Sequence, residues 1–299
     1  MQKIIDILKE NGPLSGKELF ERSRTDSLSI WRTCIKSKKI TTKIIGKRYL
    51  RLDRHVEGYA RLSPSILREF LTYTIIGLDK DIVEIKKKAE ELNKEIVKVS
   101  NEKFNLSKEI ISRIVESQIN NEEIKKKATF IIAGDIVYNM AHRDPRPESS
   151  TGMIVNGSDL DIIIVTDNIS DNIIKELDHS IYNEKYYLLK MPAYREEIDY
   201  IIKDITRVKK QSEFNSFEFM VASKILNEGK LLFGSKKLFE NIKRILKEKN
   251  ISQKIKKLEE NAIKDRKKAK SHLLRKKVTL LDDDYKKLFF TTEETEEIF

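Results

Sequence analysis

The stretch VNGSDLDIIIVTD, residues 155–167, constrains the fold of this 299-residue chain more than any other segment. Two aspartates, Asp159 and Asp161, precede a run of Ile and Val that is typical of a buried strand. Side chains alternate between the two faces of a strand, so both carboxylates point to one side while Leu160 points into the core. The spacing therefore predicts two acidic groups at the start of a buried strand.

The segments around this strand alternate between strand and helix patterns. ATFIIAGDIVYNM predicts a strand, a turn at Gly134 and Asp135, and the start of a helix, and HRDPRPESSTGMIVNG predicts a polar loop. Beyond the acidic strand, NIIKELDHSIY predicts a helix, KYYLLKM an extended segment and EEIDYIIKD a strand that carries Asp199. We expect an α/β or α+β sheet in residues 128–205, followed by helices around a turn that contains glycine.

Two carboxylates a few ångströms apart repel each other unless a cation lies between them. Magnesium is the hard cation that carboxylates and nucleotide phosphates share. The alternative is that Asp159 and Asp161 are solvated loop residues after a tight turn at Asn156 and Gly157. A third carboxylate, Asp199, lies on a strand that can pair alongside the first, and this favours a site.

Residues 128–205 resemble the DNA polymerase beta-like nucleotidyltransferase superfamily. FIIAGDIVYNM matches its strand, turn and helix, GSDLDIII matches its Asp-x-Asp strand, and EIDYII matches its third acidic strand. The helices that follow, to residue 240, are similar to the helical cap of such cores. Two features depart from the pattern: Asp135 stands where the family has Ser or Gly, and the loop before Asp159 is longer than usual.

The resemblance implies roles for named residues. Asp159 and Asp161 would hold two Mg²⁺ ions that bridge a nucleoside triphosphate and an attacking oxygen, and Asp199 would complete the second metal site or help deprotonate the acceptor. The reaction would be in-line attack on the α-phosphorus with pyrophosphate leaving. The residues expected at the nucleotide are Gly134, Gly157, Ser158 and Arg143, and His142 and Arg146 of the same loop can also reach phosphates.

Residues 1–53 resemble a winged helix-turn-helix. Three helical patterns, the second with a Ser15 and Glu18 capping box, precede two β-rich runs on either side of Gly46 and Lys47. In such domains the third helix enters a DNA groove and the hairpin contacts the backbone. The expected nucleic-acid contacts are Arg32, Lys36, Lys47 and Arg48. Docking to a protein is the alternative, because a fold specifies a shape and not a partner.

The whole chain is therefore expected to be an α+β multidomain protein. Its segments are a winged-helix-like domain at 1–56, a helical connector at 57–127, a mixed-sheet nucleotidyltransferase core with helical cap at 128–240, and C-terminal helices at 241–299 with a basic helix and an acidic tail. The connector suits either a homodimer seam or packing within its own chain. The basic helix, residues 251–277, suits either a nucleic acid or solvent.

Composition adds limits on location and partners. The net charge of +11 favours a phosphate polyanion, although an Ile- and Lys-rich composition accounts for part of it. Cys34 is the single cysteine, so no internal disulfide is possible and a reducing cytoplasm is the expected location. No apolar run approaches the roughly 18 residues that a membrane span needs, so no membrane partner is expected.

The sequence thus predicts a magnesium-dependent nucleotidyltransferase that moves a nucleoside monophosphate from a nucleoside triphosphate to an acceptor. An RNA 3′ end is slightly favoured as the acceptor, with a protein hydroxyl, a small molecule or another nucleotide open. The alternative is a DNA-binding regulator whose nucleotidyltransferase-like domain senses a nucleotide without turning it over. A third option, an interaction scaffold, leaves the three acids unexplained.

Overall fold

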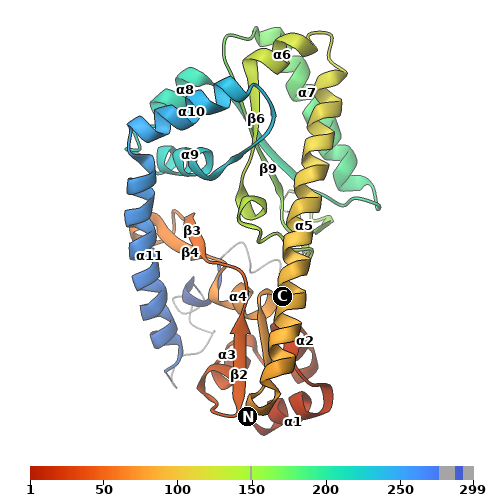
Figure 1. Ribbon diagram of the computed structural model, residues 1–299, viewed down its shortest axis with the longest axis vertical. Helices are drawn as coiled ribbons and strands as arrows, with labels where there is room; N and C mark the ends of the chain where they lie inside the picture. The colour runs from red at the N-terminus through yellow and green to blue at the C-terminus, as the bar shows by residue number, and fades with distance from the viewer. Residues whose placement is uncertain (149, 276–286, 292–299) are drawn as a thin grey trace. The chain divides into compact units, whose positions relative to one another are not determined.

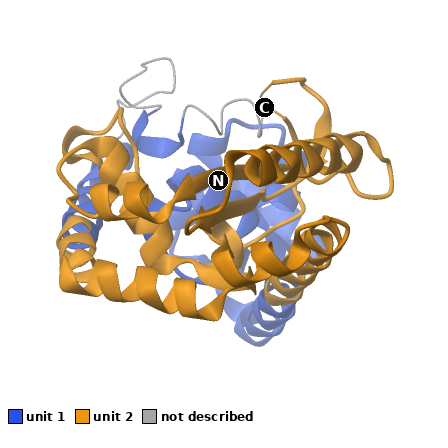
Figure 2. Cartoon of the chain, turned by 90° about the horizontal axis from the view of Figure 1, so that it is seen from above, with its two compact units in different colours: residues 1–51, 60–96, 259–299 blue, residues 52–59, 97–258 orange. Residues whose placement is uncertain are grey.

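The computed structural model describes residues 1–148, 150–275 and 287–291 of the chain. It has mixed α and β structure with several small sheets. The chain divides into two compact units, which Figure 2 colours separately. Unit 1 comprises Met1–Arg51, Ala60–Ile96 and Glu259–Phe299, and unit 2 comprises Leu52–Tyr59 and Val97–Leu258. The boundaries of these units differ from the boundaries of the four expected segments. The reason is that two long helices, α5 (Ile82–Glu116) and α11 (Ile251–Leu273), each contribute residues to both units.

Unit 1 packs short helices around a three-stranded antiparallel sheet. Its complete helices are α1 (Gln2–Asn11), α2 (Gly16–Ser23), α3 (Ser27–Lys36) and α4 (Ile66–Thr72). The strand order is β1 (Leu14–Ser15), β5 (Thr74–Leu78), β2 (Ile40–Ile44). The expected capping box is confirmed, since the Ser15 hydroxyl accepts from the Glu18 amide and Glu18 accepts from the Ser15 amide.

The predicted hairpin around Gly46 and Lys47 is wrong. β2 pairs with β5, and the run after Lys47 forms β3 (Tyr49–Leu52), which pairs with β4 (Ala60–Ser63). Every residue of β5 is buried, whereas β3 is half-exposed at its end, so β5 fits better at the centre of the sheet. The helical prediction for 74–78 is therefore wrong too, because a short apolar run does not distinguish a strand from a buried helix.

A buried carboxylate joins α4 to α11 within unit 1. Glu69, only 3% exposed, pairs with Arg48, with Lys270 Nζ at 2.9 Å and with Arg266 Nη2 at 3.3 Å. Burial alone would raise the pKa of Glu69, but these cations outweigh it and hold the pKa below its usual range. Arg48, an expected nucleic-acid contact, and Lys270 of the predicted basic helix thus take part in an internal ion cluster.

Replacing Glu69 with Gln should destabilise unit 1 by about 3–5 kcal/mol, because it leaves buried cations without their counter-charge. Urea unfolding followed by Trp31 fluorescence measures this, since the chain's single tryptophan is buried in unit 1. Asp265→Asn is the control: Asp265 pairs with Lys268 on the same helix but is exposed, so its loss should cost less than about 1 kcal/mol. Equal losses for the two variants would contradict the assignment. Because the pKa of Glu69 is lowered on folding, its contribution is present at neutral pH and disappears as pH falls through the folded-state pKa.

Unit 2 is built on a four-stranded mixed sheet. The order is β10 (Ile198–Asp204), β9 (Leu160–Thr166), β6 (Ala128–Ile132), β11 (Lys230–Gly234). β10 is parallel to β9, whereas β9 and β6 are antiparallel, as are β6 and β11. The predicted strands that contain Asp161 and Asp199 are both confirmed.

Helices cover both faces of this sheet, as Figure 1 shows. Leu160, Ile162 and Ile164 of β9 pack into a core with α5, α6 (Asn121–Lys127) and α7 (Asp171–Lys190). Ile163 and Val165 pack on the other face with α8 (Ile205–Gln211), α9 (Phe217–Glu228) and α10 (Lys236–Glu248). A central strand buried on both faces explains the unbroken apolar run in the sequence.

Several local predictions in unit 2 are corrected. The KYYLLK residues, predicted to be extended, form the last turns of α7, because Leu188 and Leu189 continue its apolar face. KLLFG, predicted within a helical region, is the edge strand β11. The turn after β6 leads into a short 3₁₀ helix, Gly134–Tyr138, and the polar loop holds a small hairpin of β7 (Pro145–Pro147) and β8 (Ile154–Asn156).

The remaining elements are two short 3₁₀ turns, Glu57–Tyr59 and Asp79–Asp81. The predicted basic helix corresponds to α11, which the structure describes to Leu273. The last two residues of the predicted basic helix and most of the predicted acidic tail, which begins at residue 282, lie outside the described residues. Among the residues described, no helix is both long enough and apolar enough to span a bilayer.

Candidate functional site

Two of the predicted acids lie next to each other on neighbouring strands. Asp199 of β10 is the register partner of Asp161 of β9, and the preceding residues, Ile198 and Leu160, are partners in the same way. Residues in register on parallel strands share a face, so Asp161 and Asp199 lie together on the face opposite to Leu160. Asp159 directly precedes β9, two residues before Asp161 and on the same side. The expected grouping at the start of these strands is present.

The turn after β6 lies directly against this group. Gly134 has φ of +68°, and a Cβ atom on it would lie 2.0 Å from Asp161 Oδ2. The backbone amide of Ala133 also donates to the Asp161 carbonyl at 3.0 Å. Only glycine combines this conformation with such a close approach, so no other residue fits at position 134 without displacing the Asp161 carboxylate.

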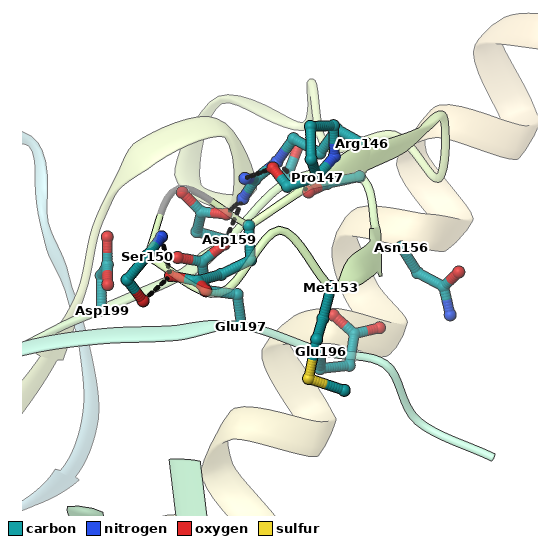
Figure 3. Close-up of polar contacts among 12 residues, drawn as sticks. Arg146, Pro147, Ser150, Met153, Asn156, Asp159, Glu196, Glu197 and Asp199 are labelled. Carbon is teal, nitrogen blue, oxygen red and sulfur yellow. Dashed lines mark hydrogen bonds and ion pairs between the residues drawn. The ribbon is translucent and has the colours of Figure 1, made fainter. Parts of the chain in front are cut away.

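Arg146 is the principal cation of the site. Its guanidinium pairs with Asp159, lies 2.8 Å from Glu197 Oε2 through Nη2, and donates from Nε to the Gly157 carbonyl at 3.0 Å. Figure 3 draws Arg146 beside Asp159 and Glu197. The Arg146 side chain is only 12% exposed, so screening by water is weak and these charge-assisted contacts are strong.

Asp199 has a cationic partner of its own, because Lys185 Nζ of α7 lies 3.1 Å from its Oδ1. Within 1–148, 150–275 and 287–291, no set of three or more His, Cys, Asp or Glu side chains is arranged to hold a metal ion. The donors that are present nevertheless have the right chemistry, because Asp159, Asp161 and Asp199 supply hard carboxylate oxygens. A magnesium ion would compete with Arg146 for Asp159 and with Lys185 for Asp199.

Asp135 has a defined position in this structure. The Ser158 hydroxyl donates to Asp135 Oδ2 at 2.9 Å and accepts from the His142 amide at 3.2 Å. Gly157, with φ of +69°, lies so close to the His142 carbonyl that a Cβ would approach it to 2.0 Å. Ser158 and Gly157 therefore join the Asp135 turn to the His142 segment, so the Ser158 hydroxyl is engaged within the protein.

A buried lysine fixes the segments that lead into both acidic strands. Lys103 of α5 donates to the carbonyls of Asn156 and Ser158, each at 2.8 Å, and pairs with Glu196 at 2.5 Å. Its side chain is 1% exposed, and burial lowers its pKa. Because residues 156–158 precede β9 and Glu196 precedes β10, Lys103 holds the starts of the two strands together.

A second charged group borders Asp135. Glu228 of α9 lies 2.6 Å from Lys224 Nζ and accepts a hydrogen bond from the Tyr138 hydroxyl. Burial raises the pKa of Glu228, and the negative charge of Asp135 adds to this. The ion pair of Glu228 with Lys224 therefore lies on α9, which packs on the same face of the sheet as the acids.

The other predicted contacts lie elsewhere. Arg143 is largely exposed and pairs with Glu102 of α5 at 2.7 Å, so it is not among the residues that hold the acids. In unit 1, Arg32 donates from Nε to the Leu273 carbonyl at 2.5 Å, Arg48 pairs with Glu69, and Lys36 and Lys47 are exposed. The four expected nucleic-acid contacts belong to unit 1 and the acids to unit 2.

Sequence reasoning missed Lys103, Lys185, Glu197, Lys224 and Glu228. Glu197 had a signal, since it lies two residues before Asp199 and strand alternation puts both on one side. The lysines had none, because their pairing depends on which helix covers which strand.

Comparison of the chain with protein-family models, with curated proteins and with solved structures gave no match.

Gly134→Ala should destabilise β9 more than Gly152→Ala. Gly152 has φ of +70° but open space around it, so both alanines carry about 1 kcal/mol of backbone strain. Only the Gly134 variant also displaces the Asp161 carboxylate, which should add about 1 kcal/mol or more. Hydrogen exchange of the β9 amides measures the local free energy of opening. Equal protection in the two variants would show that Gly134 does not constrain Asp161.

Arg146→Gln should bind Mg²⁺ about tenfold more tightly than the wild type, because the ion no longer competes with a charge-assisted contact worth roughly 1.5–3 kcal/mol. Isothermal titration calorimetry measures the affinity. Arg143→Gln is the matched control from the same loop, and its affinity should equal that of the wild type. Weaker Mg²⁺ binding in Arg146→Gln would show that Arg146 does not compete for the acids.

Proposed function

We propose that this chain is a magnesium-dependent nucleotidyltransferase that moves a nucleoside monophosphate from a nucleoside triphosphate to an acceptor, with an RNA 3′ end favoured. The observation that supports it best is the register of Asp161 and Asp199 with Gly134 packed against them. A buried strand that starts with acids, a parallel acidic neighbour and a glycine turn suit phosphoryl transfer, where positioning and electrostatics supply most of the catalysis.

In this proposal Asp161 and Asp199 hold the metal, and Asp159 joins them once Arg146 turns away. Bound Mg²⁺ would neutralise phosphate charge and activate the attacking oxygen. Arg146, released from Asp159, has a guanidinium that matches phosphate oxygens in geometry and charge. Gly134, Gly157 and Ser158 shape the turn beside the triphosphate, with Ser158 keeping Asp135 fixed.

The proposed role of unit 1 is that of a winged-helix module. Its first three helices, α1 to α3, and the order β1-β5-β2 fit such a fold if β5 serves as the second strand of the wing, with residues 45–73 inserted between the two wing strands. Lys36 and Lys47 are exposed and keep their proposed role in contacting nucleic acid. The guanidinium groups of Arg32 and Arg48 also contact groups within the unit. A cytoplasmic location and a homodimer through α5 belong to the same proposal.

The alternative is a DNA-binding regulator that binds a nucleotide without turning it over. Asp135 favours it, because a carboxylate fixed beside the turn repels a triphosphate. The ion pairs of Asp159 and Asp199 favour it as well, since both carboxylates are already neutralised by protein cations.

The test incubates the protein with each α-labelled nucleoside triphosphate, Mg²⁺ and total RNA. Asp161→Asn and Asp199→Asn should each lower label transfer by about 10²-fold or more, because each loses a charged metal ligand without a change in shape. Asp167→Asn is the matched control: Asp167 is an exposed aspartate just beyond the other end of β9, and its loss should leave transfer unchanged. Nucleotide binding that requires Asp161, without any transfer of label, would favour the regulator instead.

A further inference from the structure

The outer face of α7 carries an unusual row of side chains. Lys175, His179, Tyr182, Tyr186 and Lys190 follow one another at intervals of four, three, four and four residues, which places them on one line along the helix. All five are exposed, and the rings of Tyr182 and Tyr186 are 59% and 50% exposed. One carboxylate, Asp178, lies next to this line, and it accepts a hydrogen bond from the Tyr200 hydroxyl. Large aromatic side chains are seldom left in water on adjacent turns unless they bind something.

The row combines π-faces with positive charge. Lys190 Nζ lies 4.1 Å from the centroid of the Tyr186 ring, and Lys175 and His179 extend the same line towards the start of α7. Basic groups interleaved with aromatic faces suit a strand whose bases stack while its phosphates contact cations. A protein partner with an acidic surface would use the lysines but would not need exposed rings on successive turns.

The helix that carries the row is linked to the acids by Lys185, although α7 packs on the sheet face opposite to them. Lys185, which adjoins Tyr186 and lies three residues after Tyr182, reaches Asp199 Oδ1 at 3.1 Å. Tyr200, next to Asp199 on β10, donates to Asp178 Oδ1 of α7 at 2.9 Å. β10 is an edge strand, so no further strand separates this flank of α7 from Asp199. A strand stacked on the tyrosines would reach the proposed catalytic group by passing round the edge strand β10, where Lys185 contacts Asp199.

We propose that Tyr182 and Tyr186, with Lys185 and Lys190, form a stacking platform that binds the single-stranded end of a nucleic acid acceptor. This inference rests on the proposed function for the identity of the strand as an acceptor. The proposed substrate class is a single-stranded polynucleotide. Base-paired RNA and small-molecule acceptors would not bind this platform.

The test measures fluorescence anisotropy of a labelled U-rich single-stranded RNA oligonucleotide on the full chain, without Mg²⁺ or nucleoside triphosphate. Replacing both Tyr182 and Tyr186 with Ala should weaken binding about tenfold or more, since each stacked base contributes a factor of at least about five. Replacing both with Phe should preserve binding, because the π-faces remain. Tyr187→Ala, an equally aromatic and exposed position on the other flank of α7, is the matched control and should bind as the wild type does.

Two further oligonucleotides, a single-stranded DNA and a duplex, test which kind of nucleic acid the platform binds. Single-stranded DNA of the same sequence that binds as RNA does, and depends on the same tyrosines, would also support the platform, with selection of the sugar made elsewhere. Tighter binding of a duplex than of a single strand, or equal binding by the Ala and wild-type proteins, would overturn it. Because no nucleotide is present, a chain that transfers no label can still pass this test, and a chain that transfers label to RNA can still fail it.

Discussion

The parallel pairing of β9 with β10 is the constraint on which the candidate site depends. It places Asp199 beside Asp161, and a slip of one residue would turn Asp199 to the opposite face of the sheet. Two features fix this register. Apolar side chains of β9 are buried on both faces of the sheet, and Lys103 binds the residues that precede each strand. The position of the acids is thus a consequence of core packing and one buried lysine.

Carboxylates pair with cations in both units, but the burial of these pairs differs. In unit 1, Glu69 is shared by Arg48, Arg266 and Lys270, and all four charges are taken up in joining α4 to α11. In unit 2, the carboxylates of Asp159 and Asp199 have one cation each, from a hairpin and from a helix, and remain partly exposed. The exposed contact of Lys185 with Asp199 can be replaced by a divalent ion at modest cost, whereas the Glu69 cluster cannot open without leaving buried charge unpaired. Displacing Arg146 from Asp159 costs more than displacing Lys185, because Arg146 also pairs with the buried Glu197.

Local sequence patterns predicted the structural features that depend only on residues close together in the chain. The Ser15 capping box, the first three helices, the acidic strand at Asp161 and the strand at Asp199 were all predictable, because hydrogen bonding, apolar period and alternation are local. β5 and β11 were missed because each owes its conformation to a strand distant in the sequence. The ion pairs of Arg146 and Lys185 were beyond prediction for the same reason, and so was the close approach of Gly134 to Asp161, which depends on how the turn after β6 packs against β9.

Lys185 connects the two proposals physically, because it lies on α7 between the exposed tyrosines and pairs with Asp199. A phosphate of a strand stacked on the tyrosines would attract Lys185, and this attraction would weaken the hold of Lys185 on Asp199. The carboxylate would then be more available to a divalent ion, and by reciprocity an ion at Asp199 would leave Lys185 more available to phosphate. Acceptor and metal would therefore favour each other's binding, so that the site would reach its charged, metal-holding state chiefly when an acceptor is present.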